Sequence, residues 1–187
     1  SDWSAPGNLG PVVNSASADI EVSISKDGLS LYFASNRPGG FGNQDIWVSQ
    51  RTSVDGPWGA PQNLGPTINT AFDDRTPMLS LDGHRMYLSS DRPGGFGGTD
   101  VYVSRRRDKR DDFGWQAPEN LGGGVNTTFT ENLPFHFEDD ATGTPTLYFN
   151  SGGRPGGIGS TDIYASTLQP DGTFGPAVLV PELSSPL

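Results

Sequence analysis

Short stretches in which apolar and polar residues alternate recur along the chain, and glycine and proline separate them. A period of two is typical of β-strands, because successive side chains of a strand point to opposite faces. The pairs Asp27-Gly28 and Asp82-Gly83 predict tight hairpin turns. No stretch has a convincing helical period, so the pattern predicts an all-β protein. In the first unit it predicts four strands, at residues 20–25, 29–35, 45–51 and 58–65.

One sixteen-residue phrase organises the chain, because it occurs three times in a fixed order with a second phrase. The first phrase reads "NRPGGFGNQDIWVSQR" from residue 36, "DRPGGFGGTDVYVSRR" from residue 91 and "GRPGGIGSTDIYASTL" from residue 153. The second begins at Trp3 ("WSAPGNLGPVVNS"), Trp58 and Trp115, with a degenerate copy from Phe174. Successive copies of the first phrase are 55 and 62 residues apart, and the insertion "EDDATGTP" accounts for the longer spacing. Four short antiparallel strands in a unit of this length predict a propeller blade.

The repeats predict that residues 1–187 form a single β-propeller domain or part of one. Three repeats are expected at about 15–65, 70–122 and 127–186, with 1–14 as an extra outer-strand phrase. Three blades are too few to close a ring, since propellers typically have four to eight. We therefore expect either part of a five- or six-bladed propeller or closure by oligomerisation. The end blades then expose apolar faces that need self-association or the remainder of the propeller.

The stretch "SISKDGLSLYFASNRPGGFGNQDIWVS" resembles the PD40 repeat, a WD40-like, TolB-type β-propeller repeat. The resemblance covers nearly the whole chain and implies a propeller that is bacterial and periplasmic or secreted. It implies partners such as proteins, peptides or glycans, although the propeller fold serves both enzymes and binding scaffolds. The chain departs from the pattern in its third unit, where the Asp-Gly turn is replaced and Gly153 precedes the arginine. The first unit departs at Val22, where the other units have proline.

Composition removes several classes of function. The formal net charge is −10, which argues against binding a phosphate backbone and hence against nucleic acid as a partner. The chain has no cysteine, so disulfides and thiolate metal sites are excluded. No apolar run is long enough for a membrane span or a signal peptide. The only two histidines, His84 and His136, are expected far apart, so no metal site is predicted.

The repeated phrase is interpreted as structural. Each arginine precedes an aspartate by eight residues, and we expect the two to meet as a partly buried pair where the glycine-rich loop folds back. The pairs are Arg37 with Asp45, Arg92 with Asp100, and Arg154 with Asp162. A calcium loop is the alternative, but calcium takes six to eight oxygens and each loop offers one or two carboxylates. Direct ligand contact is a third possibility. Trp3, Trp58 and Trp115 are expected to pack between blades rather than to stack on sugars.

Function is sought where the blades differ at a shared position. The innermost strand of each blade is expected to begin with an acid, at Asp19, Asp74 and Glu131. These acids either cap their strands, the favoured interpretation, or act as the paired carboxylates of a glycoside hydrolase. Near them, the residues that vary between blades predict a polar binding ring at one end of the channel. The ring consists of Glu21, Asp73, Arg75, Asn132 and His136.

Taken together, the sequence predicts a non-enzymatic binding or scaffolding propeller without a cofactor. Its expected partners are proteins, peptides or glycans in the bacterial envelope or outside the cell. Two alternatives remain open at this stage. One is a glycoside-type hydrolase that uses the channel carboxylates, and the other is a structural unit that assembles through its open blade faces.

Overall fold

The computed structural model describes residues 5–139 and 143–185 and contains three four-stranded antiparallel sheets. Each sheet is a run of four consecutive strands that pair in chain order. The first contains β1 (Asp19–Ile24), β2 (Ser30–Ser35), β3 (Asp45–Gln50) and β4 (Gln62–Asn63). The second contains β5 (Asp74–Leu79), β6 (Arg85–Ser90), β7 (Asp100–Arg105) and β8 (Glu119–Asn120). The third contains β9 (Thr130–Glu138), β10 (Pro145–Gly152), β11 (Thr161–Thr167) and β12 (Val178–Leu179), and a 3₁₀ turn, η1 (Pro181–Leu183), follows it.

The predicted all-β fold with four antiparallel strands per repeat is confirmed. The main difference lies in the outermost strand, which was predicted at 58–65 and pairs only over Gln62–Asn63. Proline and glycine in "WGAPQNLG" explain the short strand, because proline lacks the N–H that a longer ladder needs. The predicted hairpin turns are also present, with Gly28 and Gly83 each at a φ of 75°.

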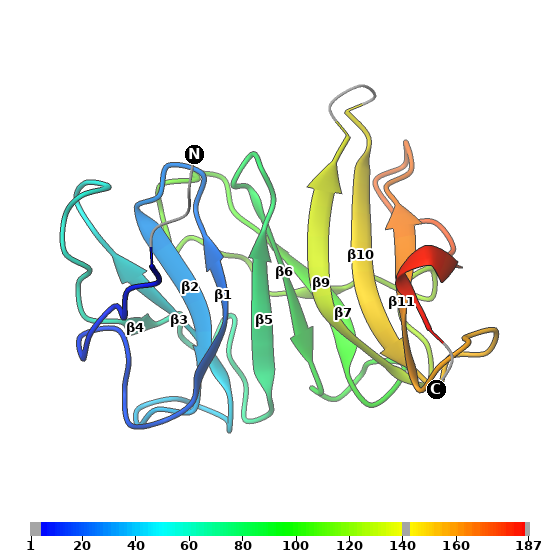
Figure 1. The fold of residues 1–187 in the computed structure, drawn as a ribbon, viewed down its shortest axis with the longest axis horizontal. Coiled ribbons are helices and arrows are strands. Elements are labelled where there is room, and N and C mark those ends of the chain that lie inside the picture. Colours follow the sequence, from blue (N-terminus) through cyan, green and yellow to red (C-terminus); the bar gives the residue numbers. More distant parts are fainter. Residues whose placement is uncertain (1–4, 140–142, 186–187) are drawn as a thin grey trace.

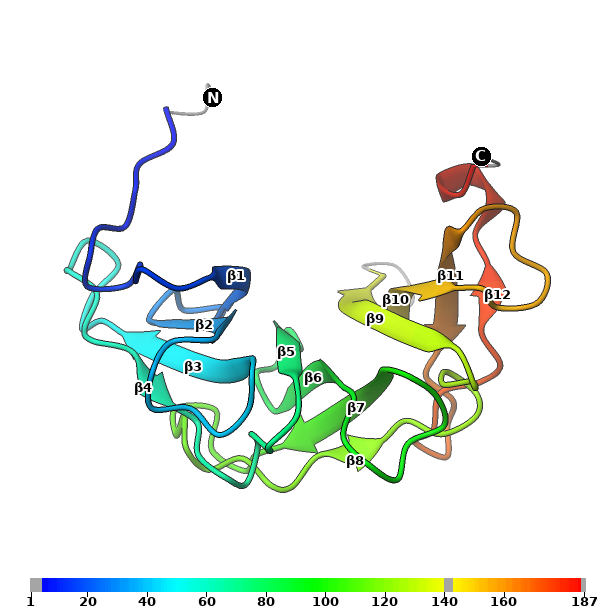
Figure 2. The same ribbon diagram turned by 90° about the horizontal axis from the view of Figure 1, so that it is seen from below.

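The three sheets stand side by side (Figure 1) and form an open arc when viewed from below (Figure 2). The strands β1, β5 and β9 line the concave side of the arc, and the short strands β4 and β8 lie on its convex side. The first strand of each repeat is therefore the inner strand, as expected for a propeller blade.

Apolar side chains fill the spaces between neighbouring sheets. Between the first and second sheets the core contains Tyr32, Ile46, Val48, Leu64, Ile68, Leu79, Met86, Leu88, Tyr102 and Trp115. Between the second and third sheets it contains Tyr87, Val101, Val103, Val125, Leu147, Phe149, Tyr164 and Phe174. A smaller cluster of Val13, Leu31, Phe33 and Trp47 covers the outer face of the first sheet, with Trp58 packed against it. Face-to-face packing of this kind fixes how the inner strands line up.

The outer face of the third sheet carries apolar side chains that are exposed to solvent. Phe135 is 55% exposed and Phe137 is 44% exposed, and the ring of Phe137 packs edge-on against Tyr148. The equivalent faces of the first and second sheets are each covered by the next sheet. This face is therefore built like a blade interface without a neighbour among the described residues.

Candidate functional site

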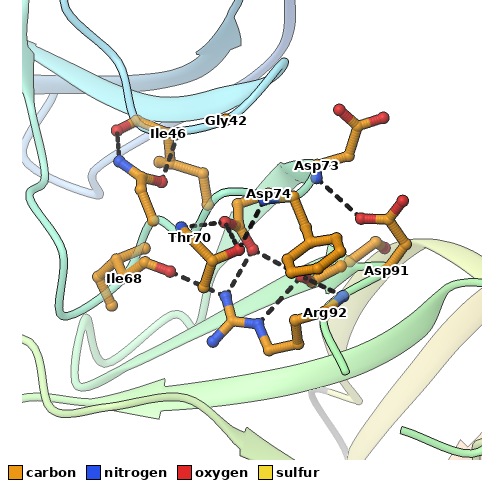
Figure 3. Close-up of polar contacts among 12 residues, drawn as sticks. Gly42, Ile46, Ile68, Thr70, Asp73, Asp74, Asp91 and Arg92 are labelled. Carbon is orange, nitrogen blue, oxygen red and sulfur yellow. Dashed lines mark hydrogen bonds and ion pairs between the residues drawn. The ribbon is translucent and has the colours of Figure 1, made fainter. Parts of the chain in front are cut away.

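The three recurring acids each lie in a ring of hydrogen bonds made by their own blade, and Asp74 shows the arrangement (Figure 3). Its Oδ2 accepts hydrogen bonds from the N–H of Thr70 at 2.5 Å and from the hydroxyl of Thr70 at 2.8 Å. Its Oδ1 accepts from the hydroxyl of Ser90 at 2.6 Å and pairs with Arg92 Nη2 at 2.5 Å. The Asp74 side chain is 0% exposed. The carboxylate ties the entry of β5 to the end of β6 and leaves no oxygen free for a substrate.

Asp19 and Glu131 repeat this arrangement in the first and third blades. Asp19 accepts from the N–H of Ser15 at 2.5 Å and the hydroxyl of Ser35 at 2.6 Å, and it pairs with Arg37 at 2.5 Å. Burial by itself raises the pKa of Asp19, but these hydrogen bonds outweigh it and lower the pKa to about 2. Glu131 is bound in the same way by Thr127 and Ser151. Its side chain is longer than that of aspartate, and its Oε1 lies 3.8 Å from Arg154 Nη1.

The predicted pairing of each arginine with the aspartate eight residues later is wrong. The arginine instead pairs with the acid that begins the inner strand, and it stacks on aromatic rings of the middle strands. The later aspartate binds the loop itself, since Asp45 accepts from the N–H groups of Phe41 and Gly42. The same holds for Asp100 with the Phe96 N–H and for Asp162 with the Ile158 and Gly159 N–H groups.

A glycine of the repeated loop is required for this second contact. A Cβ atom at Gly40 would lie 1.9 Å from the Asp45 carboxylate, and one at Gly95 would lie 1.7 Å from the Asp100 carboxylate. The loop backbone therefore approaches the aspartate more closely than any other residue permits. Burial raises the pKa of Asp45 and Asp100, although the loop N–H groups oppose it. The two halves of the phrase thus hold each blade together by two separate contacts.

The tryptophans at the shared position pack against arginines on both sides of the first sheet. Trp115 is buried between the first and second sheets, with the Arg106 guanidinium 4.3 Å from its ring centre. Trp58 is half-buried on the outer face of the first sheet, under Arg51 at 4.3 Å. Trp3 lies outside the described residues.

A strained bulge interrupts each inner strand at the same position, two residues after the recurring acid. Glu21 and Thr76 have a φ of 56° and Leu133 a φ of 52°, and the pairing register with the next strand shifts at each of them. Residues other than glycine seldom adopt this left-handed conformation, and the bulge re-aims the side chains that follow it. Strained residues of this kind cluster at functional sites, so the bulges single out this part of the arc.

A groove of about 210 Å³ lies at these bulges and is lined by all three inner strands. We call it the inner groove. Its lining residues are Glu21, Val22, Thr76, Pro77, Met78, Leu133, Pro134 and Phe135. Glu21 is the one charged residue in this lining, and its Oε2 accepts a hydrogen bond from the Thr76 N–H at 3.0 Å. Burial raises the pKa of Glu21, while the Thr76 N–H and the nearby charge of Arg75 oppose the rise.

Of the residues predicted to form a polar ring, only Glu21 lines the inner groove. Asp73 is a structural link, because it accepts from Asn43 and the Gln44 N–H and its own N–H donates to Asp91 (Figure 3). Arg75 and Asn132 flank the bulges on β5 and β9, where the Asn132 side chain accepts from the Leu133 N–H.

His136 is the clearest correction to the predicted ring. Its side chain points between the second and third sheets, where the residue is 3% exposed and its ring stacks on Tyr87 at 5.3 Å. Burial lowers the pKa of His136, so the ring is held in its neutral form. The equivalent position holds Leu79 in the second sheet, and that equivalence is the sequence signal that marks it as a core position.

Within residues 5–139 and 143–185, no group of three or more His, Cys, Asp or Glu side chains lies close enough together to hold a metal ion. The same part of the chain has no helix long and apolar enough to cross a membrane.

Comparison with known proteins supports the fold. No family model matches the chain, and no curated protein matches it. Among solved structures, an α-L-arabinofuranosidase from Lactobacillus brevis matches 93% of this chain with 15% identity and a TM-score of 0.57. An endo-arabinase from Bacteroides thetaiotaomicron matches 90% with 20% identity and a TM-score of 0.53.

The chain spans 59% of the arabinofuranosidase chain and 57% of the endo-arabinase chain. A sialidase, NanB from Streptococcus pneumoniae, matches 90% of this chain with 11% identity and a TM-score of 0.51. The three sheets thus match part of the five-bladed propellers of the family-43 and family-62 glycoside hydrolases. The chain has the fold of β-propeller blades, and its PD40-type resemblance is matched by no family model.

Proposed function

We propose that the chain supplies most of a β-propeller that binds glycans in its inner groove. The observation that carries this proposal is Glu21, a half-buried carboxylate on a strained bulge inside a groove whose other lining residues are uncharged and, apart from Thr76, apolar. Sugars present hydroxyl groups along their edges and C–H groups on their faces. A carboxylate accepts hydrogen bonds from the hydroxyls, while Phe135, Leu133 and Met78 offer apolar surface to the ring faces. The arabinofuranosidase and endo-arabinase among the similar folds also favour a glycan ligand.

Binding without cleavage is the form of this function that the described residues support best. Glycoside hydrolysis generally needs two carboxylates on either side of the scissile bond. In the described part of the groove Glu21 is alone, since Asp19, Asp74 and Glu131 are each held by hydrogen bonds within their own blade. This arrangement favours the interpretation of those three acids as strand caps.

Hydrolysis is a second candidate, and the raised pKa of Glu21 favours it. A carboxyl group whose pKa is raised by burial is suited to donate a proton to a leaving group near neutral pH. The second carboxylate would have to come from further blades, because the chain spans less than two thirds of the five-bladed chains that it matches. A glycan ligand agrees with the periplasmic or secreted location and the PD40-type repeat that we also propose.

The test is a titration calorimetry experiment with arabino- and xylo-oligosaccharides, combined with an assay for released reducing sugar. We expect binding to the wild-type chain and about tenfold weaker binding to Glu21→Gln, because a hydrogen bond to a charged group is replaced by a neutral one. Glu182→Gln, an exposed acid on η1, is the matched control and leaves binding unchanged. Sugar release that Glu21→Gln abolishes supports hydrolysis. Equal affinities of the wild type, Glu21→Gln and Glu182→Gln for the oligosaccharides would refute the inner groove as the binding site.

A further inference from the structure

The two interfaces between neighbouring sheets differ in how their outer ends are closed. In the first interface, the carboxylate of Asp112 reaches across from the loop after β7 to the first sheet. It accepts hydrogen bonds from Ser30 and Tyr32 at 2.5 Å and from Gln50 at 2.7 Å, and it pairs with Arg106 at 2.7 Å. Both charged side chains are almost completely buried. This interface therefore contains a carboxylate site that the chain fills with its own aspartate.

The second interface repeats the framework of that site with different side chains. Tyr87 pairs with Val103 as Tyr32 pairs with Val48, so the two tyrosines occupy the same place in their sheets. A second cross-strand pair occupies the same place in both sheets but differs in residue type. Ser30 and Gln50, which face each other in the first sheet, are replaced by Arg85 and Arg105 in the second.

The loop that would deliver the carboxylate is shorter in the third repeat. Nine positions separate Arg106 from Trp115, whereas six separate Leu168 from Phe174. The acid of the shorter loop, Asp171, is exposed and accepts hydrogen bonds from the N–H and hydroxyl of Thr173. Leu168 stands where Arg106 does in the first interface. Of the groups that bind Asp112, the second interface therefore keeps only the tyrosine, with two arginines in place of Ser30 and Gln50. Among the described residues, no carboxylate accepts a hydrogen bond from Tyr87 as Asp112 does from Tyr32.

A cavity of about 150 Å³ lies at this point, and we call it the interface recess. Its lining includes Arg85, Tyr87, Arg105, Glu119, Leu168 and Phe174. Tyr87 is 1% exposed, and its hydroxyl has no hydrogen-bond partner among the described residues. The ring of Tyr87 is fixed by stacking on His136 and by an edge contact with Phe174. A buried hydroxyl without a partner costs free energy, so the recess favours a ligand that accepts a hydrogen bond from it.

Two cationic side chains, Arg85 and Arg105, and one anionic side chain, Glu119, line the recess, so its charge is net positive. Arg85 lies 3.8 Å from Asp82, and Arg105 forms an ion pair with Glu119. These pairs lie at the surface, where Arg105 is 42% and Glu119 is 69% exposed, so water and salt weaken them. A ligand carboxylate placed beside Tyr87 competes for both guanidinium groups, which are well suited to bind carboxylates.

We propose that the interface recess binds the carboxylate of a small molecule, in the place that Asp112 takes in the first interface. Tyr87 donates a hydrogen bond to it, and Arg85 and Arg105 neutralise its charge. The recess is smaller than typical pockets for drug-sized ligands, so it takes an acidic head group rather than a polymer. An acidic sugar and a free amino-acid carboxylate share this chemistry. The site is separate from the inner groove and does not depend on the proposed glycan function.

The test is an NMR titration of the chain labelled at tyrosine ring carbons. The probes are methyl glucuronide and N-acetylglycine, with methyl glucoside as the neutral control. We expect an acidic probe to shift the Tyr87 signal with a dissociation constant in the millimolar range, and methyl glucoside to have no effect. The acid that binds more tightly identifies the source of the natural carboxylate.

Three variants test the residues. Tyr87→Phe removes only the hydroxyl and is expected to keep the melting temperature and weaken binding about tenfold. Arg85→Ser combined with Arg105→Gln introduces the uncharged side chains of the first interface, where Arg106 supplies the positive charge. It is expected to abolish binding, because no cation then lines the recess. Tyr148→Phe, at the same position in the third sheet, is the control and leaves binding unchanged. The proposal is overturned if neither acid binds at about 50 mM, if methyl glucoside binds equally well, or if Tyr87→Phe binds as the wild type does.

Discussion

Replacing Arg92 by methionine tests whether the arginine of the repeated phrase holds its blade together. The substitution keeps the length of the side chain but removes its charge and its hydrogen bonds to Ser90, the Ile68 carbonyl and Asp74. Asp74 is then left fully buried with a charge and no cation. Removing one partner of a buried ion pair costs about 3–5 kcal/mol. That is a large part of the 5–15 kcal/mol by which domains are typically stable.

Urea unfolding followed by tryptophan fluorescence measures the loss, because Trp47 and Trp115 are buried on opposite faces of the first sheet. The control is Arg105→Met, whose ion pair with Glu119 is exposed and is expected to contribute less than about 1 kcal/mol. A loss for Arg92→Met as small as that of the control would show that the buried pair does not stabilise the blade, and the structural interpretation of the phrase would fail.

Three further predictions concern stability and assembly. Gly95→Ala is expected to lower the free energy of unfolding in urea by about 1–3 kcal/mol, because its Cβ would overlap the Asp100 carboxylate. In the control Gly123→Ala, the new Cβ has no atom closer than 3.6 Å, and the change is expected to stay within about 0.5 kcal/mol. Equal effects of the two substitutions would contradict this prediction. His136 is neutral when folded and its pKa is lowered by burial, so the unfolded chain binds more protons below about pH 6.5. Stability therefore falls as the pH drops from 7.5 to 5.5, by at most about 1.4 kcal/mol per pH unit, and His136→Leu removes this dependence; an unchanged slope would refute it. If the exposed face of the third sheet joins a second copy of the chain, Phe137→Ser is expected to lower the mass in solution, as measured by light scattering. A mass above that of one chain that the substitution leaves unchanged would place the contact elsewhere.

The strands were predictable because their signals are local. Alternation of apolar and polar residues placed β1, β2 and β3 of the first unit within a residue or two, and the Asp-Gly pairs placed the turns. The recurring phrase predicted four strands per unit, and the structure has them. These features depend on residues close together in the chain, so a single sequence contains them.

The partners of the repeated side chains were not predictable in the same way. The sequence placed Arg37 near Asp45, eight residues away, but its partner Asp19 lies eighteen residues upstream and approaches only when β1 pairs with β2. The positions of Glu21 and Tyr87 at a groove and a recess likewise depend on packing between sheets. Comparing the three repeats position by position singled out Glu21, but neither Tyr87 nor the pairing of Arg37 with Asp19.

The different roles of Asp19 and Glu21 are tested most directly by a pH titration of the side-chain carboxyl carbons by NMR. Asp19 is bound by its own blade and is expected to titrate with a pKa of about 2. Glu21, half-buried in the inner groove, is expected to titrate above its usual value of 4.5. This result would place the structural acid on the blade and the ligand-binding acid in the groove. An Asp19 pKa at or above 3.8, together with a Glu21 pKa below 4.5, would contradict that assignment.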